Sequence, residues 1–193
     1  MKKLIFCLFI CNSLFGTAQT NPNKMIFIQP LGDVNPAIVN VVKSSVESFF
    51  GFSCTIKPKV EFTPDILAGS KTRYEAGKIL DKYHSYNYVL VLTEKDIACK
   101  NGDIPEWGIF GYGEVNGTIC VVSTFRLKRK VTEAVFLDRL QKVALHEIRH
   151  NLGLDHCTND PRCLMNDAKG TAKQVDNEKI WFCDKCRKQV GMN

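Results

Sequence analysis

The sequence predicts an α+β or α/β fold in which a small twisted mixed sheet packs with helices. In the first half of the chain, short apolar runs alternate with stretches of helical periodicity. In the second half, Asn116-Gly117 lies between two apolar segments, which is the strongest short signal for a β-hairpin. A long amphipathic segment then carries clustered histidines and predicts an active-site helix, followed by a small C-terminal subdomain.

Three apolar runs in the first half predict β-strands. They cover residues 25–29, 53–56 and 88–92, and each ends near a proline or polar residues. Between them, residues 36–50 and 72–84 have helical periodicity. Strands that alternate with helices predict βαβ units with parallel pairing.

The predicted hairpin comprises residues 108–115 and 118–123 on either side of Asn116-Gly117. We expect an antiparallel pair whose second strand forms the edge of a cleft. An edge strand has unpaired backbone groups, so an extended peptide can bind there by strand addition.

The segment 133–152 is predicted to be one helix. Thr132 can cap its first turn, and Phe136, Leu140 and Val143 recur at near-helical spacing. A packed helix of this kind holds side chains rigidly enough to bind a metal ion.

The end of this helix reads HEIRHNLGLDH, which is the pattern of a zinc hydrolase. His146 and His150 are four residues apart, so on a helix both imidazoles point to one ion. Glu147 can reach water at that ion and act as general base. Gly153 tolerates positive φ, so the chain can turn there and bring His156 to the metal.

Three protein ligands leave a fourth position open, as in catalytic zinc sites. The alternative is an ordinary helix with chance histidines. Three of the four histidines of the chain fall in this window, so the longer pattern favours a metal site over chance.

The cysteines around Met165 make the comparison more specific. The window continues as HCTNDPRCLM and is followed by FCDKC, which together resemble the archaemetzincin signature, a branch of the metzincin zinc peptidases. Further segments are similar to that family in the same order, across roughly residues 25–190: MIFIQPLGDV, KTRYEAGKILDKY and YVLVLTEKDI.

The resemblance implies a metzincin-like fold and a zinc metallopeptidase activity. It implies that Met165 forms the methionine turn beneath the catalytic metal. It also implies a second, structural zinc ion, held by Cys157, Cys163, Cys183 and Cys186. Four thiolates can enclose zinc tetrahedrally and leave no position for water. Two disulfides are the alternative for these cysteines.

The N-terminus has the features of a signal peptide: Lys2 and Lys3, an apolar stretch, and a small-x-small cleavage site before Gln19. We expect cleavage after Ala18 and a secreted or periplasmic protein, rather than a lipoprotein anchored at Cys11. The apolar run is too short for a membrane span, so no stable membrane insertion is expected after cleavage.

The predicted mature chain is one catalytic domain, residues 19–193. Its upper part covers about residues 19–153 and its lower, zinc-stapled part about 154–193. Removing residues 1–18 leaves 24 basic residues, 20 acidic residues and seven cysteines. This charge is only modestly basic, and the basic run at 126–130 lacks interleaved aromatics, so it is interpreted as a solvated connector and no nucleic-acid partner is expected.

Three cysteines remain outside the proposed zinc site. Cys99 and Cys120 are predicted to form a bridge, and Cys54 is predicted to be buried in a strand.

Together these features predict a secreted, monomeric zinc peptidase with two zinc ions, one catalytic and one structural. Its substrate is a peptide or protein, cleaved by water that zinc and Glu147 activate. Endopeptidase and aminopeptidase activity stay open. The alternative function is a secreted zinc-binding recognition protein with little or no peptidase activity.

Overall fold

The computed structural model describes residues 24–191, so the predicted signal peptide lies outside the described residues. The strands are β1 (Met25–Leu31), β2 (Ser53–Ile56), β3 (Tyr74–Glu75), β4 (Tyr88–Thr93), β5 (Ile97–Asn101), β6 (Ile104–Ile109), β7 (Gly111–Gly113) and β8 (Ile119–Ser123). The helices are α1 (Pro36–Phe50), the short 3₁₀ turn η1 (Pro64–Ile66), α2 (Ala76–Lys82), α3 (Thr124–Leu127), α4 (Glu133–Asn151), α5 (Ala172–Asn177) and α6 (Asp184–Gln189).

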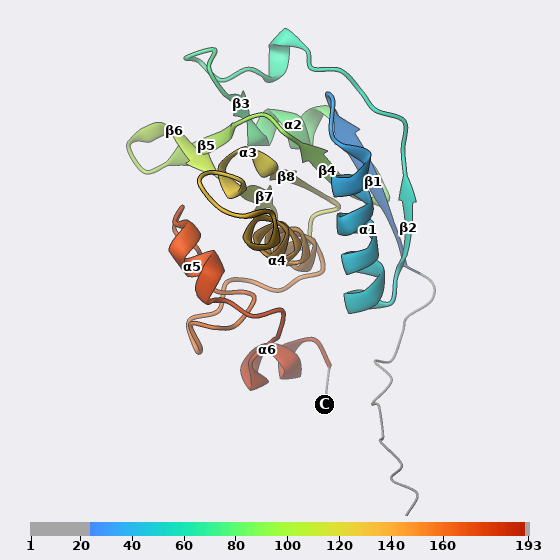
Figure 1. Ribbon diagram of the computed structural model, residues 1–193, viewed down its shortest axis with the longest axis vertical. Coiled ribbons are helices and arrows are strands. Elements are labelled where there is room, and N and C mark those ends of the chain that lie inside the picture. Colours follow the sequence, from blue (N-terminus) through green and yellow to red (C-terminus); the bar gives the residue numbers. More distant parts are fainter. Residues whose placement is uncertain (1–23, 192–193) are drawn as a thin grey trace, which may run out of the picture.

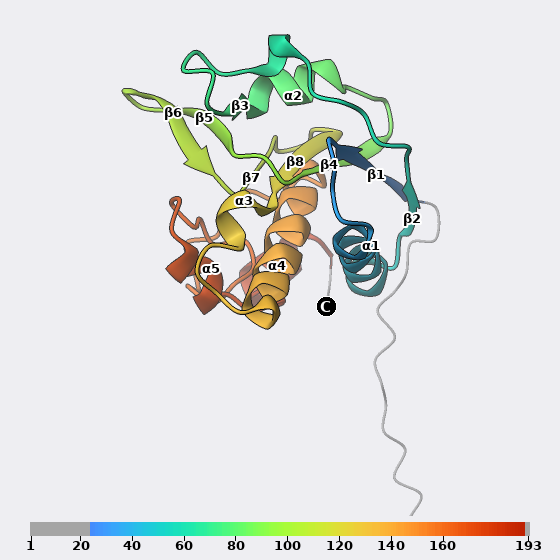
Figure 2. The same cartoon turned by 45° about the horizontal axis from the view of Figure 1, so that its top comes forward.

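The elements form three layers, with one five-stranded sheet between two layers of helices. Its strand order is β2-β1-β4-β8-β7, with all pairs parallel except β7 with β8. Helix α2 lies on one face, and α1 and α4 lie on the other (Figures 1 and 2). The predicted α+β class with a small mixed sheet and parallel βαβ pairing is confirmed.

The two faces of the sheet bury alternate residues of each strand, because successive side chains of a strand point to opposite sides. In β4, Leu90 and Leu92 join the core shared with α1 and α4. Val89 and Val91 join the second core, which α2 closes. All four side chains are at most 3% exposed, so β4 forms the centre of the fold.

Helix α1 has the boundaries that the sequence predicts, and its caps explain them. The Asn35 side chain accepts a hydrogen bond from the N–H of Ala37, and Pro36 occupies the first turn. Gly51 ends the helix at φ +68°, a left-handed conformation that favours glycine.

Three expectations about the sheets and α2 are wrong or incomplete. The predicted helix 72–84 begins only at Ala76, because β3 pairs with β5. The antiparallel hairpin β5–β6 was not predicted at all. The expected β7–β8 pairing is confirmed, but its edge assignment was wrong: β8 lies inside the sheet and the first strand, β7, is the edge.

The predicted helix at 133–152 is confirmed as α4. The Thr132 hydroxyl accepts a hydrogen bond from the N–H of Val135 at 3.4 Å. The buried Arg139 makes a two-pronged ion pair with Asp176 at 2.6 and 2.7 Å, and this pair connects α4 to α5. The C-terminal residues therefore pack directly against the helix that carries the histidines.

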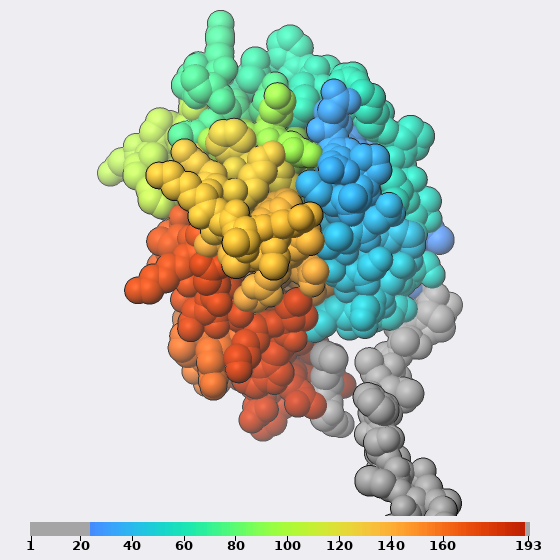
Figure 3. All heavy atoms as spheres, in the orientation of Figure 1, coloured from blue at the N-terminus to red at the C-terminus, as the bar shows by residue number. Residues whose placement is uncertain are grey.

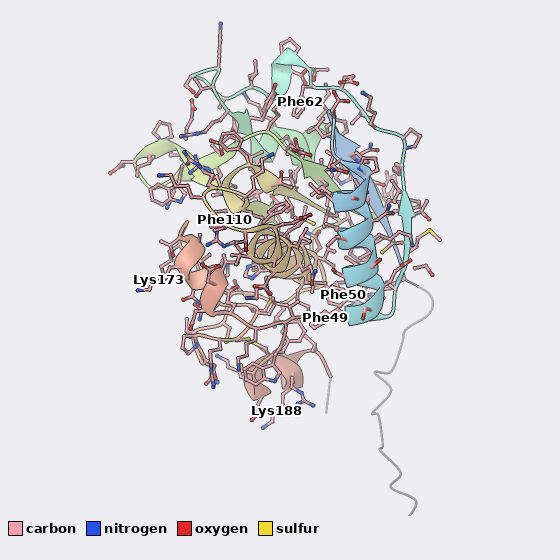
Figure 4. All side chains as sticks on the ribbon, viewed as in Figure 1. Phe49, Phe50, Phe62, Phe110, Lys173 and Lys188 are labelled. Carbon is pink, nitrogen blue, oxygen red and sulfur yellow. The ribbon has the colours of Figure 1, made fainter. Side chains whose placement is uncertain are left out.

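The chain after α4 gathers below that helix and beside the end of α1 (Figure 3). Phe49 and Phe50 lie at this end of α1 (Figure 4). The Phe49 ring meets that of Phe182 edge-on, with centroids 5.3 Å apart. An aromatic contact therefore joins the C-terminal segment to the layer formed by α1.

The basic run at 126–130 is only partly a solvated connector. Arg126 belongs to α3 and forms an ion pair with Asp96, with Nε 2.6 Å from Oδ1. Lys128 forms an ion pair with Glu94. No helix among residues 24–191 is both long and apolar enough to cross a membrane.

Candidate active site

The three histidines of the sequence motif converge on one point. His146 and His150 lie one turn apart on α4, and their Nε2 atoms are 2.9 Å apart. His156 reaches the same point from the following loop, so that one ligand atom from each residue lies within 4.8 Å of the others. The first two histidines are buried and the third is exposed.

Hydrogen bonds hold the two helical imidazoles in one tautomer. Nδ1 of His146 donates to the carbonyl of Leu164 at 2.7 Å, and Nδ1 of His150 donates to the carbonyl of Leu154 at 2.8 Å. With the proton on Nδ1, the lone pair of each Nε2 faces the shared point, which is the usual support of a metal-binding histidine. Burial lowers the pKa of both histidines, that of His146 to about 3, so both are neutral and free to ligate.

The turn at Gly153 brings His156 to this point. Its φ is +93°, and the N–H of Leu154 bonds to the carbonyl of Arg149 at 3.2 Å, in the pattern of a Schellman helix end. A Cβ at position 153 would lie 2.7 Å from the side-chain oxygen of Asn116. Both the backbone angle and the space therefore require glycine.

Met165 lies in the loop that supports His146. Its side chain is fully buried, and the carbonyl of the preceding residue, Leu164, accepts the His146 hydrogen bond. The carbonyl of Met165 itself accepts a 2.6 Å hydrogen bond from the N–H of Cys157. The loop is thereby fixed both to the active-site helix and to the cysteine cluster.

Glu147 lies between α4 and the edge strand β7. It is 8% exposed, and burial raises the pKa of its carboxyl to about 8. Gly111 and Gly113 of β7 leave room for this carboxyl. A Cβ at Gly111 would come within 2.6 Å of the Glu147 Oε1, and one at Gly113 within 3.2 Å of its Oε2. The glycines of β7 thus allow the backbone of the edge strand to approach the carboxylate.

If Glu147 is the general base that the sequence predicts, Gly111→Ala should lower the expected hydrolytic activity by about 10²-fold, since a shift of roughly 1 Å in such a group has an effect of this size. The stability of the protein should fall by less than a core truncation would cause. Gly77→Ala is the matched control, because a Cβ at Gly77 meets nothing within 4 Å. Steady-state kinetics of both variants test this expectation, and equal activity of the two would contradict it.

The histidines and Glu147 open into a cavity of about 680 Å³. This volume lies within the ordinary range for ligand-binding sites. Its walls come from the β5–β6 hairpin, β7, α4, the loop after Met165 and the end of α5. The lining residues outside the motif include Cys99, Trp107, Tyr112, Val143, Asp167, Val175 and Glu178.

The four cysteines predicted to bind zinc form a second cluster. They are all buried, and one sulfur from each lies within 4.8 Å of the others. The Cys157 and Cys183 sulfurs are 3.5 Å apart, and those of Cys163 and Cys186 are 3.8 Å apart. Sulfurs bound to one zinc at ~2.3 Å in a tetrahedron stand roughly 3.8 Å apart, whereas a disulfide bond measures about 2.05 Å. The spacing fits a shared metal ion better than two disulfides.

The thiols of this cluster differ in acidity. Burial raises the pKa of Cys163 to about 11. Burial acts in the same direction on Cys183, but hydrogen bonds from the Cys186 backbone and from neighbouring thiols outweigh it and lower the pKa to about 7. Cys183 therefore supplies a thiolate more readily than Cys163 does.

The expected bridge between Cys99 and Cys120 is absent, and all seven cysteines of the described chain are free. Cys99 lines the cavity, whereas Cys120 is fully buried in β8. Cys54 is buried in β2, as expected.

Several cavity residues have no recognisable signal in the sequence. Trp107, Tyr112 and Glu178 reach the site from β6, β7 and the end of α5. The pairing of β6 with β5, the pairing of β7 with β8 and the Arg139–Asp176 contact bring them there. The carbonyls of Leu154 and Leu164, which orient the histidines, are equally invisible in the sequence.

Comparisons with known proteins agree with this arrangement. The sequence model of peptidase family M54 matches residues 74–191. An archaemetzincin from Archaeoglobus fulgidus is 32% identical over 165 residues, which cover 86% of this chain and 98% of the relative. One from Methanocaldococcus jannaschii is 33% identical, with 86% and 92% of the two chains covered.

Solved structures give the same result. The crystal structure of the Archaeoglobus fulgidus archaemetzincin complexed with malonate has a TM-score of 0.75, with 31% identity and 86% and 99% of the two chains covered. That of the Methanopyrus kandleri archaemetzincin has a TM-score of 0.73 at 24% identity, with coverage of 90% and 97%, and supports the fold.

Proposed function

The chain belongs to the archaemetzincins, peptidase family M54, and is a zinc metallopeptidase; we propose that His146, His150 and His156 hold its catalytic zinc and that Glu147 is the general base. One observation carries this proposal. The Nδ1 hydrogen bonds of His146 and His150 turn both Nε2 atoms to a point that His156 also reaches, on the wall of the cavity that contains Glu147.

The donor set fits zinc. Neutral imidazole nitrogens are ordinary zinc ligands, and three of them leave one position open for water or substrate. When bound, zinc polarises the scissile carbonyl and makes water acidic enough to ionise near neutral pH.

The residues of the chain supply the proton transfers. Glu147 takes a proton from the attacking water and passes it to the nitrogen of the leaving amine, which becomes a free amino group. Its burial keeps the pKa of the carboxyl high, and a cation bound at the three histidines would lower it again by favouring the charged form. The carboxyl can therefore hold or release a proton at a pH near neutrality.

The edge strand β7 is the proposed binding site for the substrate backbone. Among residues 24–191 it pairs with β8 alone in the five-stranded sheet, so the backbone N–H and C=O groups on its other side have no strand partner there. An extended peptide that pairs with Gly111–Gly113 lies along the carboxyl of Glu147 and crosses the histidine site.

We propose a second zinc ion at Cys157, Cys163, Cys183 and Cys186, with a structural role. The support is the spacing of the four buried sulfurs and the chemistry of thiolates, which enclose zinc without leaving an open position. Because Cys157 directly follows His156 and its N–H bonds to Met165, such an ion would stabilise the floor of the catalytic site.

We also propose export through a signal peptide at residues 1–18, on the basis of Lys2, Lys3, the apolar stretch after them and the site after Ala18. Protein purified from its native host should then begin at Gln19. N-terminal mass analysis of that protein decides the matter, and an intact Met1 terminus would contradict export by cleavage.

Zinc removal tests the catalytic proposal. Chelation should reduce the cleavage of a denatured protein substrate by more than ~10²-fold, because the electrostatic stabilisation of the transition state is lost. Added zinc should restore the activity. The release of new amino groups measures cleavage, and circular dichroism shows whether the protein stays folded. A folded, zinc-free protein that cleaves at the original rate would contradict the proposal.

A further inference from the structure

Glu178 is a buried acidic residue of the catalytic cavity that the proposed mechanism does not use. It follows the last residue of α5, and its side chain is only 5% exposed. It lines the cavity together with Val143 of α4 and Val175 of α5. Val143 lies three residues before His146 and four before Glu147, so this wall is about one helical turn from the reacting groups.

The carboxyl of Glu178 has few partners in the structure. Its single hydrogen bond among the described residues comes from the side-chain amide of Gln174, at 3.3 Å to Oε1. None of the ion pairs found among residues 24–191 includes it. Burial is the main cause that raises the pKa of this carboxyl, to about 8. Glu178 also lines the cavity, where a ligand can supply further hydrogen-bond partners.

The neighbouring charges leave this position open to a cation. Lys142, the basic group that acts electrostatically on Glu178, already pairs with Asp138 at 2.7 Å and donates to the carbonyl of Val175 at 3.2 Å. The other charged neighbour is Asp167, which is acidic and also lines the cavity. Burial disfavours the charged form of this carboxyl, and a cation bound beside it would favour that form again.

We propose that Glu178 determines specificity by binding the ammonium or guanidinium group of a lysine or arginine next to the scissile bond. This inference rests on the proposed peptidase function. The aliphatic stem of the basic side chain lies against Val143 and Val175, and its charged end reaches the Glu178 carboxyl. The enzyme then prefers substrates with a basic residue at one of the two positions that flank the cleaved bond.

The test uses a peptide that the enzyme cleaves, made with lysine or with norleucine at each flanking position in turn. Norleucine keeps the stem of lysine without its charge. At one of the two positions the wild type should have a kcat/KM at least ~10-fold higher for lysine, since hydrogen bonds to charged groups have effects of this size. In Glu178→Gln, the ratio of kcat/KM for the lysine peptide to kcat/KM for the norleucine peptide should fall to about one. Glu61→Gln is the matched control, because Glu61 is an exposed carboxylate outside the cavity, and it should keep the wild-type ratio.

Glu178→Asp gives a second measurement that does not depend on the folding of the glutamine variant. The shorter acid lies farther from the stem, so the preference should shift from lysine toward the longer arginine. If the wild type cleaves the lysine and norleucine peptides equally, or if Glu178→Gln keeps the lysine preference, the proposed role of Glu178 is wrong. The proposed peptidase function is not contradicted by either result. A wild type that cleaves no peptide at all overturns the proposed peptidase function as well.

Discussion

Glu147→Gln should lower kcat/KM for peptide hydrolysis by about 10²–10⁴-fold, which is the usual contribution of general acid–base catalysis. Glutamine has nearly the same shape and fits the space left by Gly111 and Gly113, but it cannot take the proton from water. The loss should appear in kcat, because the proposed zinc ligands and the proposed binding strand β7 are unchanged. Steady-state kinetics give kcat and KM of the variant, and metal analysis by mass spectrometry gives its zinc content.

The control for this experiment is Glu133→Gln, in the first turn of the same helix and outside the cavity. It should keep wild-type kinetics. If Glu147→Gln retained both its zinc and more than half of the wild-type kcat, another group would have to be the base, and the proposed role of Glu147 would be wrong.

Cys186→Ser should reduce the zinc content from two ions per chain to one and strongly destabilise the fold. The binding free energy of a structural zinc ion contributes directly to folding. A loss of roughly 3–5 kcal/mol corresponds to a fall in Tm of about 6–20 °C for a chain of this size. Differential scanning calorimetry and metal analysis on the same sample measure both effects.

Cys54→Ser provides the comparison, since Cys54 is also buried but lies in β2, away from the cysteine cluster. It should keep both zinc ions. Two zinc ions in Cys186→Ser would contradict the second site, as would a native protein in which the four cysteines are joined as two disulfides.

The sequence predicts the active-site helix well because the relevant interactions are local. Thr132 caps α4, His146 and His150 lie one turn apart, and Gly153 has the positive φ that a sharp turn requires. Each of these depends on residues within a few positions of one another. Their convergence with His156 could therefore be predicted without knowledge of the rest of the fold.

The order of the last two strands could not be derived in the same way, because it depends on which strand pairs with β4. One signal was present: all five residues of β8 are apolar or small, as in a strand buried on both faces, whereas β7 is the short Gly-Tyr-Gly segment. That difference favours β7 as the edge strand.

The sequence predicts the β5–β6 hairpin and the position of Glu178 even less well. Strand β5 ends in Cys99, Lys100 and Asn101, and β6 contains Pro105, so neither has the alternation of a half-buried strand. Glu178 resembles any surface glutamate in the sequence. Only the docking of α5 against α4, through Arg139 and Asp176, buries it in the cavity wall.

The most direct test of the catalytic assignment is a mass-spectrometric map of the bonds cut in a mixed peptide library, with zinc-loaded wild type and Glu147→Gln incubated side by side. We predict defined cleavages by the wild type that are absent or reduced at least ~10²-fold in the variant. The map also shows whether the cuts fall inside peptides or at their N-termini. Identical cleavage maps at equal rates, or no cleavage by a wild type with its full zinc content, would contradict the assignment of this site as the peptidase centre.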